Sequence, residues 1–262
     1  MSKLFPLCSS SKGNCTYLSG GGSAVLIDAG ISLRALVSSL SAQGLSTDAL
    51  GGILITHEHT DHISGLTALL KKTKLPVYAS AGTLDFLIAG DFIPPDTTLI
   101  EVTSPFCVGE LRVTPFPTPH DAAESIGFRF ELPDLSTVAI ATDLGHITDL
   151  IRACLTGCDV VMLESNYDRG MLDCSAYPYF LKRRIKGDLG HLSNESCAAE
   201  ALRLVHNGTT RIVLAHLSEQ SNLPALAHAV TRSVLQAQQM CENRDYILKV
   251  APARSAQEIL VF

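Results

Sequence analysis

Residues 53–65 of the chain read Ile53-Leu54-Ile55-Thr56-His57-Glu58-His59-Thr60-Asp61-His62-Ile63-Ser64-Gly65. An apolar strand ends here, a cluster of histidines follows, and a helix begins. Alternate side chains of an extended loop point to the same side, so His57 and His59 would face one point. The turn into the helix would aim Asp61 and His62 at a neighbouring point. Because imidazole and carboxylate groups suit zinc, iron or manganese, this segment predicts ligands for two adjacent metal ions.

Three further residues of ligand type stand at strand ends downstream. His120, Asp143 and His216 each follow a short run of apolar or β-branched residues. Any one of them alone is equally well explained as an ordinary surface residue. Their joint pattern is typical of a site built on the edge of a rigid scaffold, so all three are candidate ligands.

Short apolar strands alternate with amphipathic helical segments along the whole chain. The expected strands cover residues 17–18, 24–28, 52–55, 77–79, 99–102, 111–116, 126–130, 137–141, 159–163, 211–214 and 246–250. The expected helices cover residues 33–43, 64–72, 150–155, 179–186, 194–206 and 223–240. Hairpin turns are expected at 20–22 and 133–136, from their glycines and from Pro-Asp-Leu-Ser. Strand clusters followed by helices, in two successive halves, predict an α+β fold of two packed sheets with helices outside.

The cluster from His57 to His62, with His120, Asp143 and His216, resembles the full ligand set of the metallo-β-lactamase superfamily. Within it, the chain is similar to the YycJ/WalJ (VicX) branch of single-domain, exonuclease-like hydrolases. Residues 9–14, 163–168, 190–194 and 215–219 carry that closer resemblance. Tyr167 departs from it, since many relatives have histidine there. The resemblance implies a four-layer αββα sandwich of two mixed sheets, with residues 1–262 as one domain of two pseudo-repeat halves, roughly 1–130 and 131–262.

The resemblance also implies how the metal ions are held. Metal one takes His57, His59 and His120, while metal two takes Asp61, His62 and His216. Asp143 bridges the two ions. The ions are divalent, zinc or manganese with iron as a third option, and a hydroxide between them is the nucleophile. Two cations lower the pKa of bound water and stabilise charge that develops on the attacked centre.

His191 is the leading candidate for a catalytic residue that is not a ligand. It precedes a predicted helix whose N-terminal amides favour an anion, so it could bind a phosphate oxygen or protonate a leaving group. A histidine packed against the helix start is the alternative. Glu164 could orient His191 or a ligand, or be purely structural. The predicted catalytic residues are His191, Asp61 and Glu164, and the predicted substrate-binding residues are Ser9, Ser10, Asn14, His191, Ser193 and Asn194.

The composition limits the partners and the compartment. The formal net charge of −6 weighs against a broad nucleic-acid surface, which would be basic. Two local basic segments, Lys71–Lys74 and Lys182–Lys186, could line a groove or be solvated helix faces. None of the eight cysteines forms a Cys-x-x-Cys pair, and no stretch is apolar enough for a membrane span. We therefore expect a cytoplasmic protein with reduced thiols and no membrane partner, and leave its oligomeric state open.

Three functions are weighed. The first is a phosphodiesterase, most simply an exonuclease-like enzyme acting on nucleic acid or a small phosphodiester. His59 favours hydrolysis, because oxygen-reducing relatives typically carry glutamate there, and 22 residues between His120 and Asp143 leave no room for a long tRNA-gripping arm. The second is a thioester, lactone or lactam hydrolase, since the same ions can polarise a carbonyl. The third is a metal-bearing regulatory protein of envelope signalling, against which the complete ligand set argues.

Overall fold

Two sheets form the centre of the computed structural model, which describes residues 1–254 and 259–262. The first sheet contains β1 (Lys3–Ser10), β2 (Gly13–Gly20), β3 (Ser23–Ile27), β4 (Leu50–Leu54), β5 (Val77–Ala79), β6 (Leu99–Glu101) and β14 (Leu260–Val261). The second contains β7 (Phe106–Val108), β8 (Leu111–Pro117), β9 (Ile126–Glu131), β10 (Thr137–Ala141), β11 (Val160–Glu164), β12 (Arg211–Ala215) and β13 (Ile247–Val250). The strand orders are β14-β1-β2-β3-β4-β5-β6 and β13-β12-β11-β10-β9-β8-β7. Each sheet mixes parallel and antiparallel pairs.

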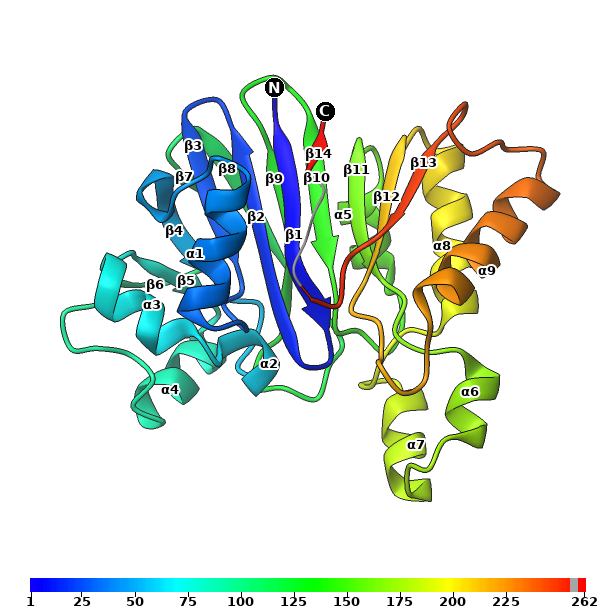
Figure 1. The fold of residues 1–262 in the computed structure, drawn as a ribbon, viewed down its shortest axis with the longest axis horizontal. Coiled ribbons are helices and arrows are strands. Elements are labelled where there is room, and N and C mark those ends of the chain that lie inside the picture. Colours follow the sequence, from blue (N-terminus) through cyan, green and yellow to red (C-terminus); the bar gives the residue numbers. More distant parts are fainter. Residues whose placement is uncertain (255–258) are drawn as a thin grey trace.

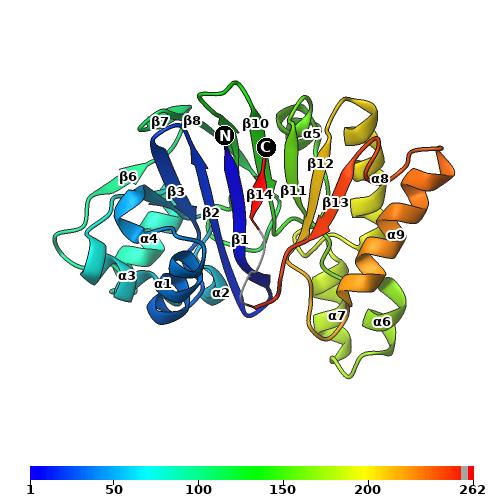
Figure 2. The ribbon, with the colours of Figure 1, turned by 45° about the horizontal axis from the view of Figure 1, so that its top comes forward.

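Helices cover the outer face of each sheet (Figure 1). On the first sheet they are α1 (Leu33–Ala42), α2 (Thr60–Ile63), α3 (Leu66–Thr73) and α4 (Ala81–Ala89), with a 3-10 turn at Thr47–Ala49. The second half contains α5 (Asp149–Leu155), α6 (Arg169–Cys174), α7 (Tyr179–Lys186), α8 (Asn194–His206) and α9 (Pro224–Ala237). Helices α5, α8 and α9 pack on the second sheet. Figure 2 shows α6 and α7 as a pair that projects away from the sheets, below α8 and α9.

The core has three apolar layers, as a four-layer sandwich requires. The central layer lies between the sheets and joins residues of both, such as Val25 and Phe128. A second layer lies between the first sheet and its helices, where Leu36 of α1 is buried. The third lies between the second sheet and its helices, where Leu204 of α8 is buried. The predicted αββα sandwich is confirmed.

The sheet topology brings the predicted ligands to one edge of the molecule. Strands β3 and β4 are parallel, and so are β10, β11 and β12. Because carboxyl ends of parallel strands meet at the same edge, the loops that follow these strands lie together. Those loops carry the histidine cluster, Asp143 and His216, and the site therefore spans the ends of both sheets.

Several elements differ from the predicted ones. The helix expected at 64–72 is α3, and the separate short helix α2 precedes it at residues 60–63. Strand β2 is much longer than residues 17–18. Strands β1, β7 and β14 and helices α4 and α6 were not predicted. In β1 the residue Pro6 hid the strand, because proline cannot donate to a ladder. Among the described residues, its outer neighbour β14 pairs only with Lys3 and Leu4, so Pro6 lies beyond the paired part of that edge.

Candidate metal centre

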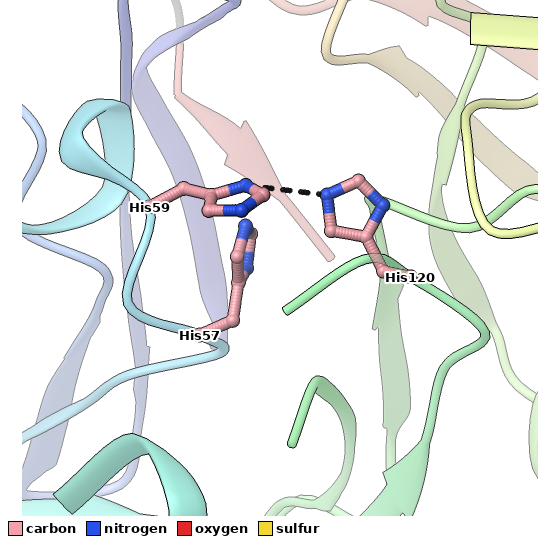
Figure 3. A group of neighbouring side chains, drawn as sticks. All are labelled: His57, His59 and His120. Atoms are coloured by element: carbon pink, nitrogen blue, oxygen red, sulfur yellow. Dashed lines mark hydrogen bonds between the residues drawn. The ribbon is translucent and has the colours of Figure 1, made fainter. Parts of the chain in front are cut away.

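Three histidines converge from two sheets to form the first ligand group. His57 and His59 lie in the loop after β4, and His120 lies in the loop after β8. Figure 3 shows their rings turned toward one another, with Nε2 of His120 3.3 Å from Nδ1 of His59. One ring nitrogen from each lies within 4.8 Å of the others. This arrangement can hold one metal ion through three imidazoles.

A second ligand group adjoins the first. Oδ2 of Asp61 lies 3.4 Å from Nε2 of His62 and 3.4 Å from Nε2 of His216. The three atoms again fall within 4.8 Å of one another. The rings of His57 and His62 are 4.1 Å apart between centroids, so the two groups share a border.

Asp143 lies at that border. Its Oδ2 is 3.3 Å from Nε2 of His62, and its Oδ1 is 3.3 Å from Nδ1 of His216 and 3.7 Å from Nε2 of His120. Two buried atoms here, Asp143 Oδ2 and His57 Nε2, have no hydrogen-bond partner among the described residues. Buried polar atoms without partners are costly unless something coordinates them. The site therefore fits cations held by His57, Asp143 and their neighbours.

Hydrogen bonds orient the ligand rings from outside the site. Nδ1 of His62 donates to Oδ2 of Asp28 over 2.8 Å. Thr56 donates to the same carboxylate through its backbone N, over 2.8 Å, and through its hydroxyl. The hydroxyl also lies 3.1 Å from Nδ1 of His57. Nδ1 of His120 donates to the carbonyl of Gly190 over 3.0 Å. Each bond leaves Nε2 of its histidine facing the site, as partners of metal-binding histidines do.

Asp28 is a residue of the site that was not predicted from the sequence. It directly follows the apolar strand β3, which is the same signal that identified Asp143 and His216. All three residues have left-handed backbone conformations, with φ of 58° at Asp28, 59° at Asp143 and 53° at His216. Such conformations are uncommon outside glycine and concentrate at functional sites. Each turns a side chain sharply out of its strand toward the metal centre.

The ligand loop is clamped against the loop after β3. The backbone N of Ala29 donates to the carbonyl of His62, and the N of Gly65 donates to the carbonyl of Ala29, both over 2.8 Å. A Cβ at Gly30 would lie 1.6 Å from the carbonyl oxygen of Asp61. Only glycine permits this approach, which fixes the position of the ligand loop.

Glu164, at the end of β11, lies between His191 and His216. Its Oε1 accepts from Nδ1 of both, each over 2.8 Å. Its Oε2 accepts the backbone N of Leu144 and of Leu192. His191 keeps 20% of its side chain exposed, whereas Glu164 is fully buried. The structure therefore gives Glu164 contacts with both the predicted catalytic histidine and a predicted ligand.

The residues predicted to bind substrate lie mostly beneath the site. Ser9 and Ser10 are buried, and Oγ of Ser9 accepts the backbone N of His216 over 2.8 Å. Ser193 caps α8, and the buried side chain of Asn194 bonds Ser165 and Asn222. These four side chains take part in hydrogen bonds within the fold, and their direct contact with substrate stays a prediction.

Asn14 is different from those four residues. Its Nδ2 donates to Oδ2 of Asp61 over 3.0 Å and lies 3.0 Å from Nε2 of His62. The amide thus touches two predicted ligands directly.

The acidic and basic side chains of the centre shift one another's pKa values. Burial raises the pKa of Asp143, but His216 and His62 outweigh it and hold the pKa well below its usual range. Burial, assisted by His62, lowers the pKa of His57 well below its usual range. Burial also lowers the pKa of His216, but Asp143, Asp61 and Glu164 raise it to about 10. In the metal-free state, protons on histidine thus balance the buried carboxylates, and these are the protons that a cation would replace.

The beta-lactamase superfamily domain matches residues 23–217. Exodeoxyribonuclease YycJ of Bacillus anthracis is 36% identical over 234 residues, covering 88% of each chain. Exodeoxyribonuclease WalJ of Streptococcus pneumoniae is 34% identical over 226 residues, covering 85% of this chain and 84% of the relative.

A solved structure shares the fold at low identity. The metallo-beta-lactamase fold protein YhfI of Bacillus subtilis superposes with a TM-score of 0.74 at 16% identity, over 98% of this chain and 100% of the other. Within the described residues, no helix is both long and apolar enough to cross a membrane. The family resemblance read from the motifs is confirmed, and the chain belongs to the metallo-β-lactamase superfamily.

Proposed function

We propose that the chain is a binuclear metal-dependent phosphodiesterase that removes nucleotides from the ends of DNA. The relatives named exodeoxyribonucleases support the substrate, because the similarity extends over most of each chain. The observation that carries the reaction type is the pair of His191 and Glu164. His191 is partly exposed and lies beside the two proposed ligand groups, neither of which includes it.

The proposed ligands are those read from the sequence. His57, His59 and His120 hold one ion, and Asp61, His62 and His216 hold the other. Asp143 lies between them, within 3.3 Å of a nitrogen of His62 and of His216. Two divalent ions bound here, zinc or manganese, would lower the pKa of water and stabilise charge on the phosphoryl oxygens.

His191 is the proposed general acid or phosphate anchor. Its ring centroid lies 5.1 Å from that of His120 and 5.3 Å from that of His216, so it borders both ligand groups. Its Nδ1 is held by Glu164. Nε2 of His191 then remains to contact a phosphate oxygen or to deliver a proton to the leaving oxygen. Glu164 orients the ring and is a positioning residue.

Residues 1–262 are proposed to act as one domain, because the ligands come from loops of both sheets. The cytoplasm is the proposed compartment. All eight cysteines, which lie in the described ranges, are free thiols, and cytosolic proteins keep their thiols reduced.

The test is an assay of protein loaded with zinc or manganese on end-labelled single- and double-stranded DNA and RNA. Bis-p-nitrophenyl phosphate, nitrocefin and a thioester are assayed in parallel, since a carbonyl hydrolase would use the same ligands. The proposal expects release of nucleotides from DNA ends that chelation abolishes and added metal restores. Efficient cleavage of the thioester or of nitrocefin with all phosphodiesters intact would contradict it, and absence of any turnover would favour a regulatory role.

The control variant is His228→Ala. His228 lies on α9, where its Nε2 pairs with Glu242 over 3.0 Å, so its loss should leave every activity unchanged.

A further inference from the structure

One face of α7 carries two aromatic and two arginine side chains that point to solvent. Tyr179 is 76% exposed and Phe180 is 73% exposed. Arg183 and Arg184 follow them at the i+4 spacing, so each arginine lies beside an aromatic ring on the helix surface. We call these four residues the α7 face. Aromatic side chains with this exposure are unusual on a protein surface and mark interaction sites when they cluster.

The C-terminal end of α7 is attached to the metal centre. Arg184 bonds Asp121, which directly follows the ligand His120. The backbone N of His191 donates to the carbonyl of Ile185 over 2.9 Å, and the N of Asp121 donates to the carbonyl of Leu189 over 3.1 Å. These bonds hold α7 against both the ligand loop and the proposed catalytic histidine. The α7 face therefore begins at the centre and leads away from it.

The charged groups of α7 differ in their availability. Lys182 donates to the carbonyls of Asp173 and Ser175, each over 2.7 Å, and Lys186 bonds the carboxylate of Asp173. These two lysines of the basic segment are therefore used to pack α7 against α6. Arg183 is exposed and makes no hydrogen bond or ion pair with the described residues. The guanidinium of Arg183 thus lies on the same face of α7 as the rings of Tyr179 and Phe180.

We propose that the α7 face binds a single-stranded segment of the nucleic acid whose end occupies the metal centre. Unpaired bases stack on exposed aromatic rings whatever their sequence, and arginine neutralises the phosphates beside them. A duplex hides its base faces and cannot stack in this way. The proposal agrees with the acidic net charge of −6, because a local aromatic stripe needs no broad basic surface. It rests on the proposed nuclease function and specifies which form of nucleic acid the enzyme takes.

The length of α7 determines how many nucleotides a single strand needs in order to reach from the metal centre to Tyr179. Eight residues of helix span roughly 12 Å. At the roughly 3.4 Å spacing of stacked nucleotides, that distance corresponds to three or four nucleotides beyond the end in the site. A dinucleotide would not reach Tyr179.

The experiment measures binding of full-length, metal-loaded protein to a labelled dinucleotide, to a labelled single strand of about 16 nucleotides and to a duplex. Their phosphorothioate linkages keep them from being consumed. The variant is Tyr179→Ala/Phe180→Ala, and the matched control is Phe86→Ala, an exposed aromatic on α4. The double variant should weaken binding of the longer single strand on the order of ten- to a hundredfold, with duplex binding unchanged. Arg183→Ala should lower the slope of log affinity against log salt concentration by about one, because one phosphate contact is lost. Arg34→Ala on α1 should leave that slope unchanged.

Turnover of bis-p-nitrophenyl phosphate separates this proposal from the proposed function. It should be unchanged in the double variant, because Tyr179 and Phe180 are not among the proposed ligands or the proposed catalytic residues. If wild-type protein hydrolyses no phosphodiester, the nuclease function fails, while single-strand binding still decides the role of the α7 face. Equal single-strand affinity in wild type and double variant would overturn the inference. So would wild-type protein that binds no single strand, or a variant whose only change is in self-association by light scattering, which would make the face a contact for protein.

Discussion

Asp28 accepts a 2.8 Å hydrogen bond from Nδ1 of His62, and both side chains are buried. This bond leaves Nε2 of His62 as the atom that faces Asp61 and Asp143. Burial lowers the pKa of His62, but Asp28 and Asp143 raise it well above its usual range. The carboxylate of Asp28 thus orients the ring of His62, a proposed ligand, while Asp28 itself is not a proposed ligand.

Asp28→Asn should weaken binding at the second metal by about 10- to 100-fold, the usual cost of losing such a partner. Asparagine tolerates the φ of 58°, so the fold should survive. Isothermal titration with zinc measures the affinity. Asp159→Asn is the control, since Asp159 also accepts from a threonine, Thr137, but lies at the opposite ends of the strands. Two zinc sites of wild-type affinity in Asp28→Asn would refute the role.

His191→Ala should leave both metal ions bound and lower turnover by roughly 10²–10⁴-fold, because it removes a proton-transfer or phosphate-binding group. His216→Ala should deplete the second metal, because it removes a ligand. Metal analysis and kinetics on the same preparations measure both. Loss of metal from His191→Ala, with His216→Ala retaining two ions, would exchange the roles of the two residues.

The leaving group distinguishes acid catalysis by His191 from phosphate binding. A p-nitrophenolate needs little protonation to leave, whereas the alkoxide of a nucleotide needs much more. If His191 donates a proton, the penalty of His191→Ala should be larger on DNA than on the p-nitrophenyl ester. Equal penalties on the two substrates would indicate phosphate binding.

Asp143 allows a test of backbone strain at the metal centre. Asp143→Asn and Asp143→Val both remove the buried charge, but only asparagine tolerates the φ of 59°. Metal-free Asp143→Val should therefore unfold with a free energy about 1–3 kcal/mol lower than that of Asp143→Asn. Urea unfolding of both variants measures the difference. Equal stabilities would show that the conformation carries no strain.

Metal binding should release protons. The pKa of His216 is raised to about 10, so this side chain is protonated at neutral pH in the metal-free protein. A cation must displace that proton, and metal affinity should increase as the pH rises toward 10. Titrations in buffers of different ionisation enthalpy would report the released protons. A binding heat that is independent of the buffer would contradict this expectation.

Metal should also stabilise the fold, because the ligands come together only when both sheets are packed. At a free metal concentration of 100 times Kd, the stabilisation is about 2.7 kcal/mol. For a chain of this size that corresponds to a rise in Tm of roughly 5–10 °C. Differential scanning fluorimetry with and without chelator measures it. An unchanged Tm would mean that metal binds outside the sandwich.

Residues of the candidate metal centre could be predicted from the sequence where a local pattern of residues marks them. An apolar strand that runs into His or Asp is visible in the chain, and this pattern located Asp143 and His216. Asp28 follows the same pattern but was read only as the end of a strand. Its role depends on His62, which lies 34 residues away, and only the folded structure shows that contact.

The supporting residues illustrate the same limit. Ser9 and Asn14 belong to a motif that resembles the family, and the sequence placed them near the site. It did not show that Ser9 holds the backbone of His216, 207 residues away, while Asn14 touches Asp61. Such contacts depend on long-range packing, which a local motif does not show.

The short strand β14 has a consequence for the solubility of the protein. Among the described residues it pairs with Lys3 and Leu4 of β1, and Pro6 further along that strand has no backbone N–H to offer. Unpaired strand edges recruit other chains, and a proline on the edge is one means by which proteins prevent it. Removal of residues 259–262 would leave the upper part of β1 as an open edge, so a shortened chain would join its copies edge to edge while its metal centre remained intact.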